Sequence, residues 1–291
     1  MNEENVLKIA IPNKGRMSEK IYNLLTSAGL NFPSKDERTL QVSTKDKKHK
    51  IIFVRTADIP RFLEAGVADI GFTGFDIVTE LKADVEKIMD LDFGGCEMVV
   101  AVKEEDPYDC TADLPERINV ATSFPNIAKE YLEKAGKKPK IIEVTGATEI
   151  TPRLGLSDVV VDITSSGSTL KSNKLKIIDK ILDSCAIVVA RKGLSSELRK
   201  KTDTLLTALR SVLEAREKKY LMANVPKDKL DEIREFLPGF TAPTVMTMMG
   251  DDKNVVIHVV VDADRVFDSV EHLKALGGQG ILIMTVDQMV R

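Results

Sequence analysis

Short apolar runs alternate with amphipathic stretches from residue 6 to residue 191, and this alternation restricts the chain to an α/β fold. The first such pair is the apolar run "VLKIAIP" followed by the amphipathic stretch "EKIYNLLTSA". We expect a strand and then a helix there, with Ser18 as the N-terminal cap and Gly29 as the stop. The same pairing recurs along the chain, so the sequence predicts sheets with packed helices.

The alternation stops at a polar connector and then resumes. The connector is "KEEDPYDCTADLPE", and the pattern after it runs on to "SDVVVDI". The stretch "KLKIIDKILDSCAIVVAR" then returns the chain to the first unit, so we expect two α/β lobes joined by two crossings, with a cleft between them. The expected boundaries are 1–102 with 187–217 for the first lobe, 103–186 for the second lobe and 218–291 for a C-terminal domain.

The C-terminal domain follows a different order of elements. A long helical pattern, "SSELRKKTDTLLTALRSVLEAREKK", precedes it, and either Ser195 or Ser196 is expected to cap that helix. The remaining residues alternate between apolar runs and helical patterns in the order β-α-β-β-α-β. This order is typical of a ferredoxin-like domain.

Charge and cysteine content argue against several classes of partner. Lys and Arg number 42 against 45 Asp and Glu, so the chain lacks the basic excess that nucleic-acid binding requires. Its three cysteines, Cys96, Cys110 and Cys185, contain no C-x-x-C pair, which argues against a zinc site and a disulfide framework. The sequence shows no signal-peptide pattern and no apolar run near the ~18 residues of a membrane span. We expect a cytoplasmic protein with neither a membrane nor a nucleic acid as its partner.

One strand end carries more hydrogen-bonding capacity than a turn requires. The run "VVVDITSSGSTL" leaves an apolar strand at Asp162 and continues with small residues around Gly167. Gly167 allows a close approach of the backbone, and the surrounding hydroxyl groups are donors suited to a phosphate monoester. These hydroxyl groups belong to Ser165, Ser166, Ser168 and Thr169. Asp162 would accept hydrogen bonds from sugar hydroxyls, so the segment suits a ribose 5-phosphate group.

A purely structural explanation of this loop stays open, because Ser and Thr also cap helices and Asp162 could form an Asx-turn. The density of hydroxyl groups after the strand favours the ligand-binding interpretation. Three further loops fall at expected strand ends, where ligands of open α/β sheets bind. They are "NKGR", "GFTG" and "TGATE".

The loop and several other blocks resemble one enzyme family. "VVVDITSSGSTL" resembles the phosphoribosyl-pyrophosphate loop of the ATP phosphoribosyltransferases, and it fits the salvage phosphoribosyltransferases less well because Ile163 follows Asp162 where those show a second acid. The other matching blocks follow in the same order as in the family: "LKIAIPNKGRM", "FVRTADIP", "ADIGFTGFD", "ATSFPNIAKEYL", "VTGATEITPRLGLSDVVVDI" and "LPGFTAPTV". One departure is Glu97, which stands where a basic residue is expected in many members, and we assign it no role.

The resemblance implies a fold, a reaction and a set of partners. The fold would be a two-lobed, periplasmic-binding-protein-like catalytic core with a C-terminal ACT-like, ferredoxin-like domain. The reaction would move phosphoribose from phosphoribosyl pyrophosphate to N1 of ATP, with Mg²⁺ held mainly by the pyrophosphate and with its protein ligands unknown. The long form of the family also implies feedback inhibition by histidine, binding of AMP-type nucleotides, and dimers that assemble into hexamers.

The resemblance also implies roles for particular residues. Asp162 would hold the ribose hydroxyls, and Lys14 and Arg16 would be cations for the pyrophosphate or the ATP phosphates, although ordinary loop solvation also explains both. Glu149 would contact a substrate hydroxyl or Mg²⁺, unless it only favours the positive end of a helix. We expect these four residues to be the catalytic ones. The 5-phosphate would be held by Thr164, Ser165, Ser166, Gly167, Ser168 and Thr169.

Further residues complete the implied sites. Gly15 would contact the pyrophosphate or the ATP phosphates, like Lys14 and Arg16. Arg55 is a weaker candidate for the same contact. Gly71, Thr73 and Gly74 would form a second phosphate cradle, unless the glycines only allow a tight turn. The implied contacts for inhibitory histidine are Asn224, Thr244 and Gly280, unless the C-terminal domain only assembles subunits. The competing hypothesis of another class is a two-lobed small-molecule-binding or sensor module without catalysis.

Overall fold

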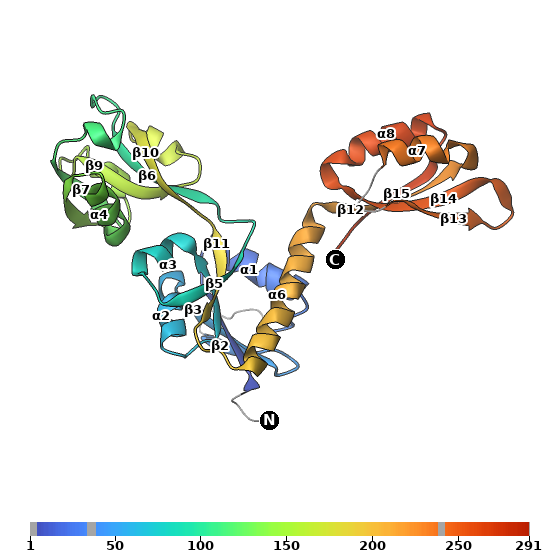
Figure 1. Cartoon of the computed structure of the whole chain (residues 1–291), viewed down its shortest axis with the longest axis horizontal. Helices are drawn as coiled ribbons and strands as arrows, with labels where there is room; N and C mark the ends of the chain where they lie inside the picture. Colours follow the sequence, from blue (N-terminus) through green and yellow to red (C-terminus); the bar gives the residue numbers. More distant parts are fainter. Residues whose placement is uncertain (1–4, 34–38, 238–241, 291) are drawn as a thin grey trace. The chain divides into compact units, whose positions relative to one another are not determined.

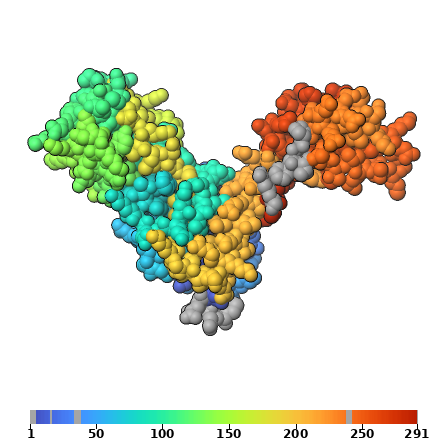
Figure 2. Space-filling model, in the orientation of Figure 1, coloured from blue at the N-terminus to red at the C-terminus, as the bar shows by residue number. Residues whose placement is uncertain are grey.

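The computed structural model of the chain describes residues 5–33, 39–237 and 242–290, without the side chain of Arg16. Two compact units emerge, Met1–Tyr22 with Asn31–Thr202, and Asn23–Leu30 with Asp203–Arg291. The first unit contains two lobes, each with its own sheet, and the second unit contains a third sheet. Figure 1 labels most of the helices and strands, and Figure 2 shows the chain as a space-filling surface in the same orientation.

The first lobe is built, within the described residues, on a six-stranded sheet in the order β2-β3-β1-β4-β11-β5. Its strands are β1 (Leu7–Pro12), β2 (Gln41–Ser43), β3 (His49–Val54), β4 (Ile70–Gly74), β5 (Val85–Asp90) and β11 (Ala186–Arg191). The lobe also contains α1 (Arg16–Ser27), α2 (Ile59–Glu64) and α3 (Phe75–Leu81). β1 runs parallel to β3 and β4, so the carboxyl ends of these three strands share one edge of the sheet.

The second lobe carries a five-stranded sheet, again counting described residues only, in the order β10-β6-β9-β7-β8. Its strands are β6 (Cys96–Lys103), β7 (Arg117–Thr122), β8 (Lys138–Glu143), β9 (Val159–Thr164) and β10 (Leu175–Ser184), with α4 (Pro125–Lys134) and the short α5 (Ser168–Ser172). β7 runs parallel to both β8 and β9, so the loops that follow these strands lie at one edge. Ile118, Val120 and Val161 form a core with Ile127 and Leu132 of α4.

The chain passes between the two lobes twice. It leaves the first sheet after β5 and returns between β10 and β11, where Cys185 is the one intervening residue. The expected boundary at residue 102 falls inside β6, which pairs with β9 and β10 of the second sheet. By strand pairing, β6 therefore belongs to the second lobe, and the polar connector lies within that lobe.

The second unit has the expected β-α-β-β-α-β order after the long helix α6 (Ser196–Arg216). Its elements are β12 (Lys218–Pro226), α7 (Leu230–Phe236), β13 (Thr244–Met248), β14 (Asp251–Asp262), α8 (Val266–Ala275) and β15 (Gln279–Thr285), and the strands form an antiparallel sheet in the order β13-β14-β12-β15. Alternate residues of β12 and β14 are buried in one core with Ile233 and Leu273 of the two helices. The Ser195 hydroxyl accepts the Leu198 N–H at 3.3 Å, which confirms a serine cap for α6.

Three local expectations are wrong. Helix α1 already begins at Arg16, so Ser18 lies in its first turn and donates its hydroxyl to the Pro12 carbonyl at 2.7 Å instead of capping. The expected helix over "ATEITPRLG" is only a 3-10 turn, Thr148–Ile150, followed by irregular backbone. "GFTG" is not a loop but the end of the fully buried strand β4.

Candidate active site

The hydroxyl-rich loop follows β9 and folds back on itself through local hydrogen bonds. The Thr164 hydroxyl accepts the Gly167 N–H at 2.8 Å, and the hydroxyls of Ser166 and Ser168 are 2.9 Å apart. Gly167 has a φ of 70°, in the left-handed region that glycine adopts without strain. The backbone is thus turned so that the flanking side chains stay outside the core. The exposed hydroxyl residues are Ser165, Ser166, Ser168 and Thr169.

Asp162 lies two residues before the end of β9 and is partly buried. Its Oδ1 accepts the Ile163 N–H at 2.8 Å. Burial raises the pKa of the Asp162 carboxyl, the hydrogen bonds from the Ile163 backbone and the Thr148 side chain oppose that shift, and the charge of Glu149 adds to it. The structure therefore brings the "TGATE" and "DITSSGST" segments together, with Glu149 close enough to Asp162 to affect its ionisation.

A pocket of about 590 Å³ opens beside this loop. The loop after β9 contributes Thr164, Ser165, Ser166 and Gly167 to its lining, and Lys171 and Ile177 lie nearby in that lining. The rest of the lining comes from the segment that begins β6 and from the end of β10: Gly95, Cys96, Glu97, Asp183 and Ser184. Exposed hydroxyls, a cation and two carboxylates in one hollow can bind a phosphorylated sugar through several polar contacts at once.

The part of the lining that comes from β6 and β10 is not predictable from the sequence alone. β6 runs antiparallel to both β9 and β10, and this register puts Glu97 opposite Thr164 on one strand and Asp183 on the other. Lys180 lies between the two carboxylates, 3.2 Å from Glu97 and 3.0 Å from Asp183. Because like charges on paired strands repel, Lys180 stabilises this wall. Such pairing joins distant parts of the chain and leaves no local signal in the sequence.

Ser184 connects the pocket wall to the first lobe. Its hydroxyl donates to Asp76 Oδ1 at 2.7 Å, and its oxygen accepts the Asp76 N–H at 3.0 Å. Both residues are buried. Cys96 lies beside this pair, and burial together with the charge of Asp76 raises the pKa of its thiol, so the neutral thiol is favoured.

The predicted cations of the first lobe lie at the shared edge of the parallel strands. Lys14 and Gly15 are exposed between β1 and α1, and Gly15 has a φ of 91°. Arg55 is exposed directly after β3, and the Asn13 N–H donates to the Val54 carbonyl at 2.7 Å, which joins the two segments. Arg16 begins α1, and its side chain lies outside the described part of the structure.

The three predicted cradle residues of β4 are buried. The Thr73 hydroxyl donates to the Thr56 carbonyl at 3.1 Å. A Cβ on Gly71 would lie 2.4 Å from Ile59 Cγ2, and one on Gly74 would lie 2.2 Å from Asp76 Oδ1. Packing therefore accounts for both glycines without a ligand, and their predicted contact with phosphate stays a prediction.

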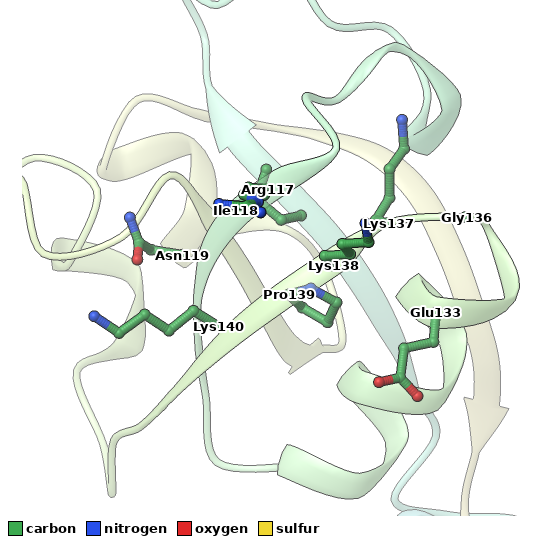
Figure 3. A pocket seen from close by; sticks show the side chains of 9 residues that line it. All are labelled: Arg117, Ile118, Asn119, Glu133, Gly136, Lys137, Lys138, Pro139 and Lys140. Atoms are coloured by element: carbon green, nitrogen blue, oxygen red, sulfur yellow. The ribbon is translucent and has the colours of Figure 1, made fainter.

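A larger hollow, of about 670 Å³, lies at the opposite ends of β7 and β8. It is lined by Arg117, Ile118, Asn119, Glu133, Gly136, Lys137, Lys138, Pro139 and Lys140. Figure 3 shows that the Lys137 and Glu133 side chains point away from each other. The Lys137 ammonium donates to the Ala112 carbonyl at 2.7 Å, and Lys138 pairs with Glu116 at 2.6 Å. Since Lys137 and Lys138 are already engaged, and Lys137 points away from Glu133, we do not assign the active site to this hollow.

Two kinds of feature are missing from the described residues, a cluster of metal ligands and a membrane-spanning helix. Nowhere within residues 5–33, 39–237 and 242–290 do three His, Cys, Asp or Glu side chains gather as a group that could hold a metal ion. A bound Mg²⁺ commonly takes one or two carboxylates together with substrate phosphates. Asp162 and Glu149 could supply such carboxylates beside a substrate phosphate. Among the helices of the described ranges, not one combines the length and apolar character needed to cross a membrane.

Two of the three predicted histidine contacts lie together in the second unit. Asn224 is half-buried in β12, and a Cβ on Gly280 of β15 would lie 3.1 Å from Asn224 Nδ2. Thr244 is exposed at the start of β13, opposite His258 of β14. Part of the "LPGFTAPTV" block lies in 238–241, outside the described residues.

Comparison with known proteins gives matches along nearly the whole chain. A family model described as ATP phosphoribosyltransferase matches residues 55–211, and one described as the HisG C-terminal domain matches residues 215–288. Proteins named ATP phosphoribosyltransferase from Methanocaldococcus jannaschii and Gemmatimonas aurantiaca are each 42% identical to this chain, over 98% of its length and 100% of theirs. A similar solved structure is the "ATP phosphoribosyl transferase (HisG:HisZ) complex" from Thermotoga maritima, with 34% identity and a TM-score of 0.64 over 72% of this chain and 99% of that one.

Proposed function

The chain belongs to the ATP phosphoribosyltransferase family, and we propose that its loop Asp162–Thr169 holds the ribose 5-phosphate part of phosphoribosyl pyrophosphate. The family reaction is the first step of histidine biosynthesis, and the chain is therefore a glycosyltransferase rather than a sensor without catalysis. One observation carries the assignment of the site. Asp162 lies on β9 at the carboxyl edge of parallel strands, and Ser165 and Ser166 of the loop that follows line a pocket of about 590 Å³.

The proposed chemistry needs orientation more than acid or base catalysis. N1 of the adenine ring is unprotonated at neutral pH, so it attacks the ribose C1 directly while the bond from C1 to the pyrophosphate oxygen breaks. Positive charge develops on the sugar and negative charge on the leaving group. Positioned charges and hydrogen bonds can supply most of the rate in such a reaction.

Each proposed residue then has a defined task. Asp162 accepts hydrogen bonds from the ribose hydroxyls, and its charge favours the developing positive charge of the sugar. Glu149, whose charge acts on Asp162, contacts a substrate hydroxyl or Mg²⁺. Lys14, Arg16 and, more weakly, Arg55 stabilise the departing pyrophosphate or the ATP phosphates. The hydroxyls of the loop hold the 5-phosphate.

Mg²⁺ belongs to the proposed reaction as a partner of the pyrophosphate. When bound there, it neutralises the charge of the leaving group. The protein would contribute a carboxylate from Asp162 or Glu149, in agreement with the donor set described above. AMP-type nucleotides would occupy the ATP position because they share the adenine and ribose groups.

The second unit is proposed to bind histidine as a feedback inhibitor. Asn224 would accept a hydrogen bond from the ammonium or imidazole of histidine, next to Gly280 and with Thr244 nearby. We also propose that the chain forms homodimers that assemble into hexamers, and that it acts in the cytoplasm. The T. maritima structure is itself a complex.

One assay tests the proposed site directly. The purified chain is mixed with ATP, phosphoribosyl pyrophosphate and Mg²⁺, and the appearance of a new adenine-derived chromophore is followed. Binding of ribose 5-phosphate is measured separately by calorimetry, for the wild type and for Asp162→Asn. If the wild type turns over but both proteins bind ribose 5-phosphate equally well, Asp162 does not hold the ribose hydroxyls.

A further inference from the structure

Glu80 is a buried carboxylate to which the proposed chemistry gives no task. It lies on α3 of the first lobe and is 9% exposed. Its Oε1 accepts the Asn126 N–H at 2.9 Å, and its Oε2 accepts the Ile127 N–H at 3.0 Å. The Asn126 side-chain amide donates in return to the Glu80 carbonyl at 3.0 Å. Three hydrogen bonds thus join α3 of the first lobe to the start of α4 in the second.

Glu80 completes a helix cap that α4 lacks within its own lobe. The first N–H groups of a helix have no partner inside the helix. At the start of α4, Pro125 has no N–H, and the Ala128 N–H is bound by the Phe124 carbonyl at 3.0 Å. The N-terminal neighbour, Phe124, has no side-chain acceptor, so the two remaining N–H groups depend on Glu80. A carboxylate also interacts favourably with the positive end of a helix.

The contact lies one element away from the proposed site in each lobe. In the first lobe, β4 runs directly into α3, with Gly74 as the N-cap. In the second lobe, β7 leads into α4 and pairs in parallel with β9, which leads into the proposed 5-phosphate-binding loop Asp162–Thr169, here named the phosphate loop. Fixing the start of α4 therefore fixes the edge of the second sheet from which the phosphate loop extends.

We propose that Glu80 is a positioning residue for the transfer reaction. By capping α4 from the other lobe, it holds the phosphate loop in a fixed position relative to the loops of the first lobe. The inference rests on the proposed location of the sugar phosphate. An exposed ion pair at 3.2 Å joins Lys82, the residue directly after α3, to Glu130 of α4. Exposed pairs contribute little energy, so this pair supplies a matched control.

The test compares Glu80→Gln with Glu130→Gln. Glutamine keeps the size of glutamate but has only one oxygen, so it cannot accept both N–H groups. For Glu80→Gln, kcat should fall about 10- to 100-fold, because small displacements of reacting groups are costly. Its affinity for ribose 5-phosphate, measured by calorimetry, should stay within about twofold of the wild type, since that ligand touches the second lobe alone. Amide exchange at Asn126 and Ile127 should become at least about tenfold faster.

Asn126→Ala removes only the returning amide bond and should lower kcat a few-fold. Glu130→Gln should match the wild type in every measurement. The proposal is overturned if amide exchange in Glu80→Gln is unchanged, if exchange accelerates while kcat does not fall, or if kcat and ribose 5-phosphate affinity fall in parallel. Failure of ribose 5-phosphate to bind the wild type would instead remove the assignment of the loop, while kcat and amide exchange would still decide the role of Glu80.

Discussion

The Ser184 hydroxyl and the Asp76 carboxylate form a buried hydrogen bond of 2.7 Å, which ties the strand that returns from the second lobe to the first turn of α3. The Asp76 backbone N–H donates to the same hydroxyl at 3.0 Å, so two hydrogen bonds join these residues. Ser184 also lines the proposed substrate pocket. The wall of that pocket is thus anchored to the first lobe.

Replacing Gly74 by Ala should break this anchor. The new Cβ would lie 2.2 Å from Asp76 Oδ1, so the carboxylate must leave Ser184. Losing a buried hydrogen bond to a charged group should lower the free energy of unfolding by about 1–3 kcal/mol, measured by denaturant titration. Gly95→Ala is the control, because a Cβ there meets nothing within 4 Å. Equal stability of the two variants would contradict the prediction.

Asp162→Asn should reduce turnover by at least about 100-fold, because the variant loses the charge that faces the developing positive sugar. The new side chain keeps the shape and can still accept the Ile163 N–H. Initial rates of chromophore formation give the comparison, and circular dichroism checks the fold. Activity near the wild-type level would show that Asp162 does not act on the sugar.

Asp162→Asn should lower turnover, but it should leave stability at neutral pH unchanged or raise it. Since burial raises the pKa of Asp162 in the folded state, its contribution to stability is fully present below the ordinary value of 3.8 and is lost as the pH rises through the folded-state pKa. At pH 7–8, Asp162→Asn should therefore melt at the same temperature as the wild type or higher. The difference in melting temperature between Asp162→Asn and the wild type should shrink on acidification. Thermal melts from pH 8 to below 3.8 measure this difference. A variant that is less stable at neutral pH and recovers in acid would have the wrong sign.

Local patterns predicted most of the fold. β1, β7 and the serine cap of α6 follow from apolar runs and a capping residue next to them in the sequence. The loop after β9 was also predictable, because Asp162 and the hydroxyls are contiguous. By contrast, "GFTG" has the composition of a loop, and only its pairing with β1 and β11 shows that it is a buried strand.

The rest of the site depends on contacts between distant segments. Glu97 faces the pocket because β6 pairs with β9, and no property of the "CEMVVAV" run specifies that partner. The cap of α4 comes from Glu80, on a helix of the other lobe. An amphipathic pattern predicts that a helix exists, but it does not identify the acid that completes its first turn.

Asn224→Ala should weaken inhibition by histidine about 10- to 100-fold, because a hydrogen bond to a charged ligand group contributes about 1.5–3 kcal/mol. The measurement is the histidine concentration that halves the turnover of each protein. Lys253→Ala, an exposed change on β14, serves as the control. An unchanged inhibition constant would move the histidine contact away from Asn224.

Gly167→Ala should damage substrate binding more than its backbone strain explains, and Gly155→Ala provides the comparison. Gly167 has a φ of 70° and Gly155 a φ of 71°, so alanine suffers similar strain at both positions, about 1–2 kcal/mol. An added Cβ meets only Ile177 Cδ1 at 3.8 Å in the first case and nothing within 4 Å in the second. The two variants should therefore lose similar stability in denaturant titrations. Only Gly167 lies where the backbone must approach the 5-phosphate, so only Gly167→Ala should weaken ribose 5-phosphate binding, by about tenfold or more. Equal affinities of the two variants would mean that the glycine serves the turn and not the ligand.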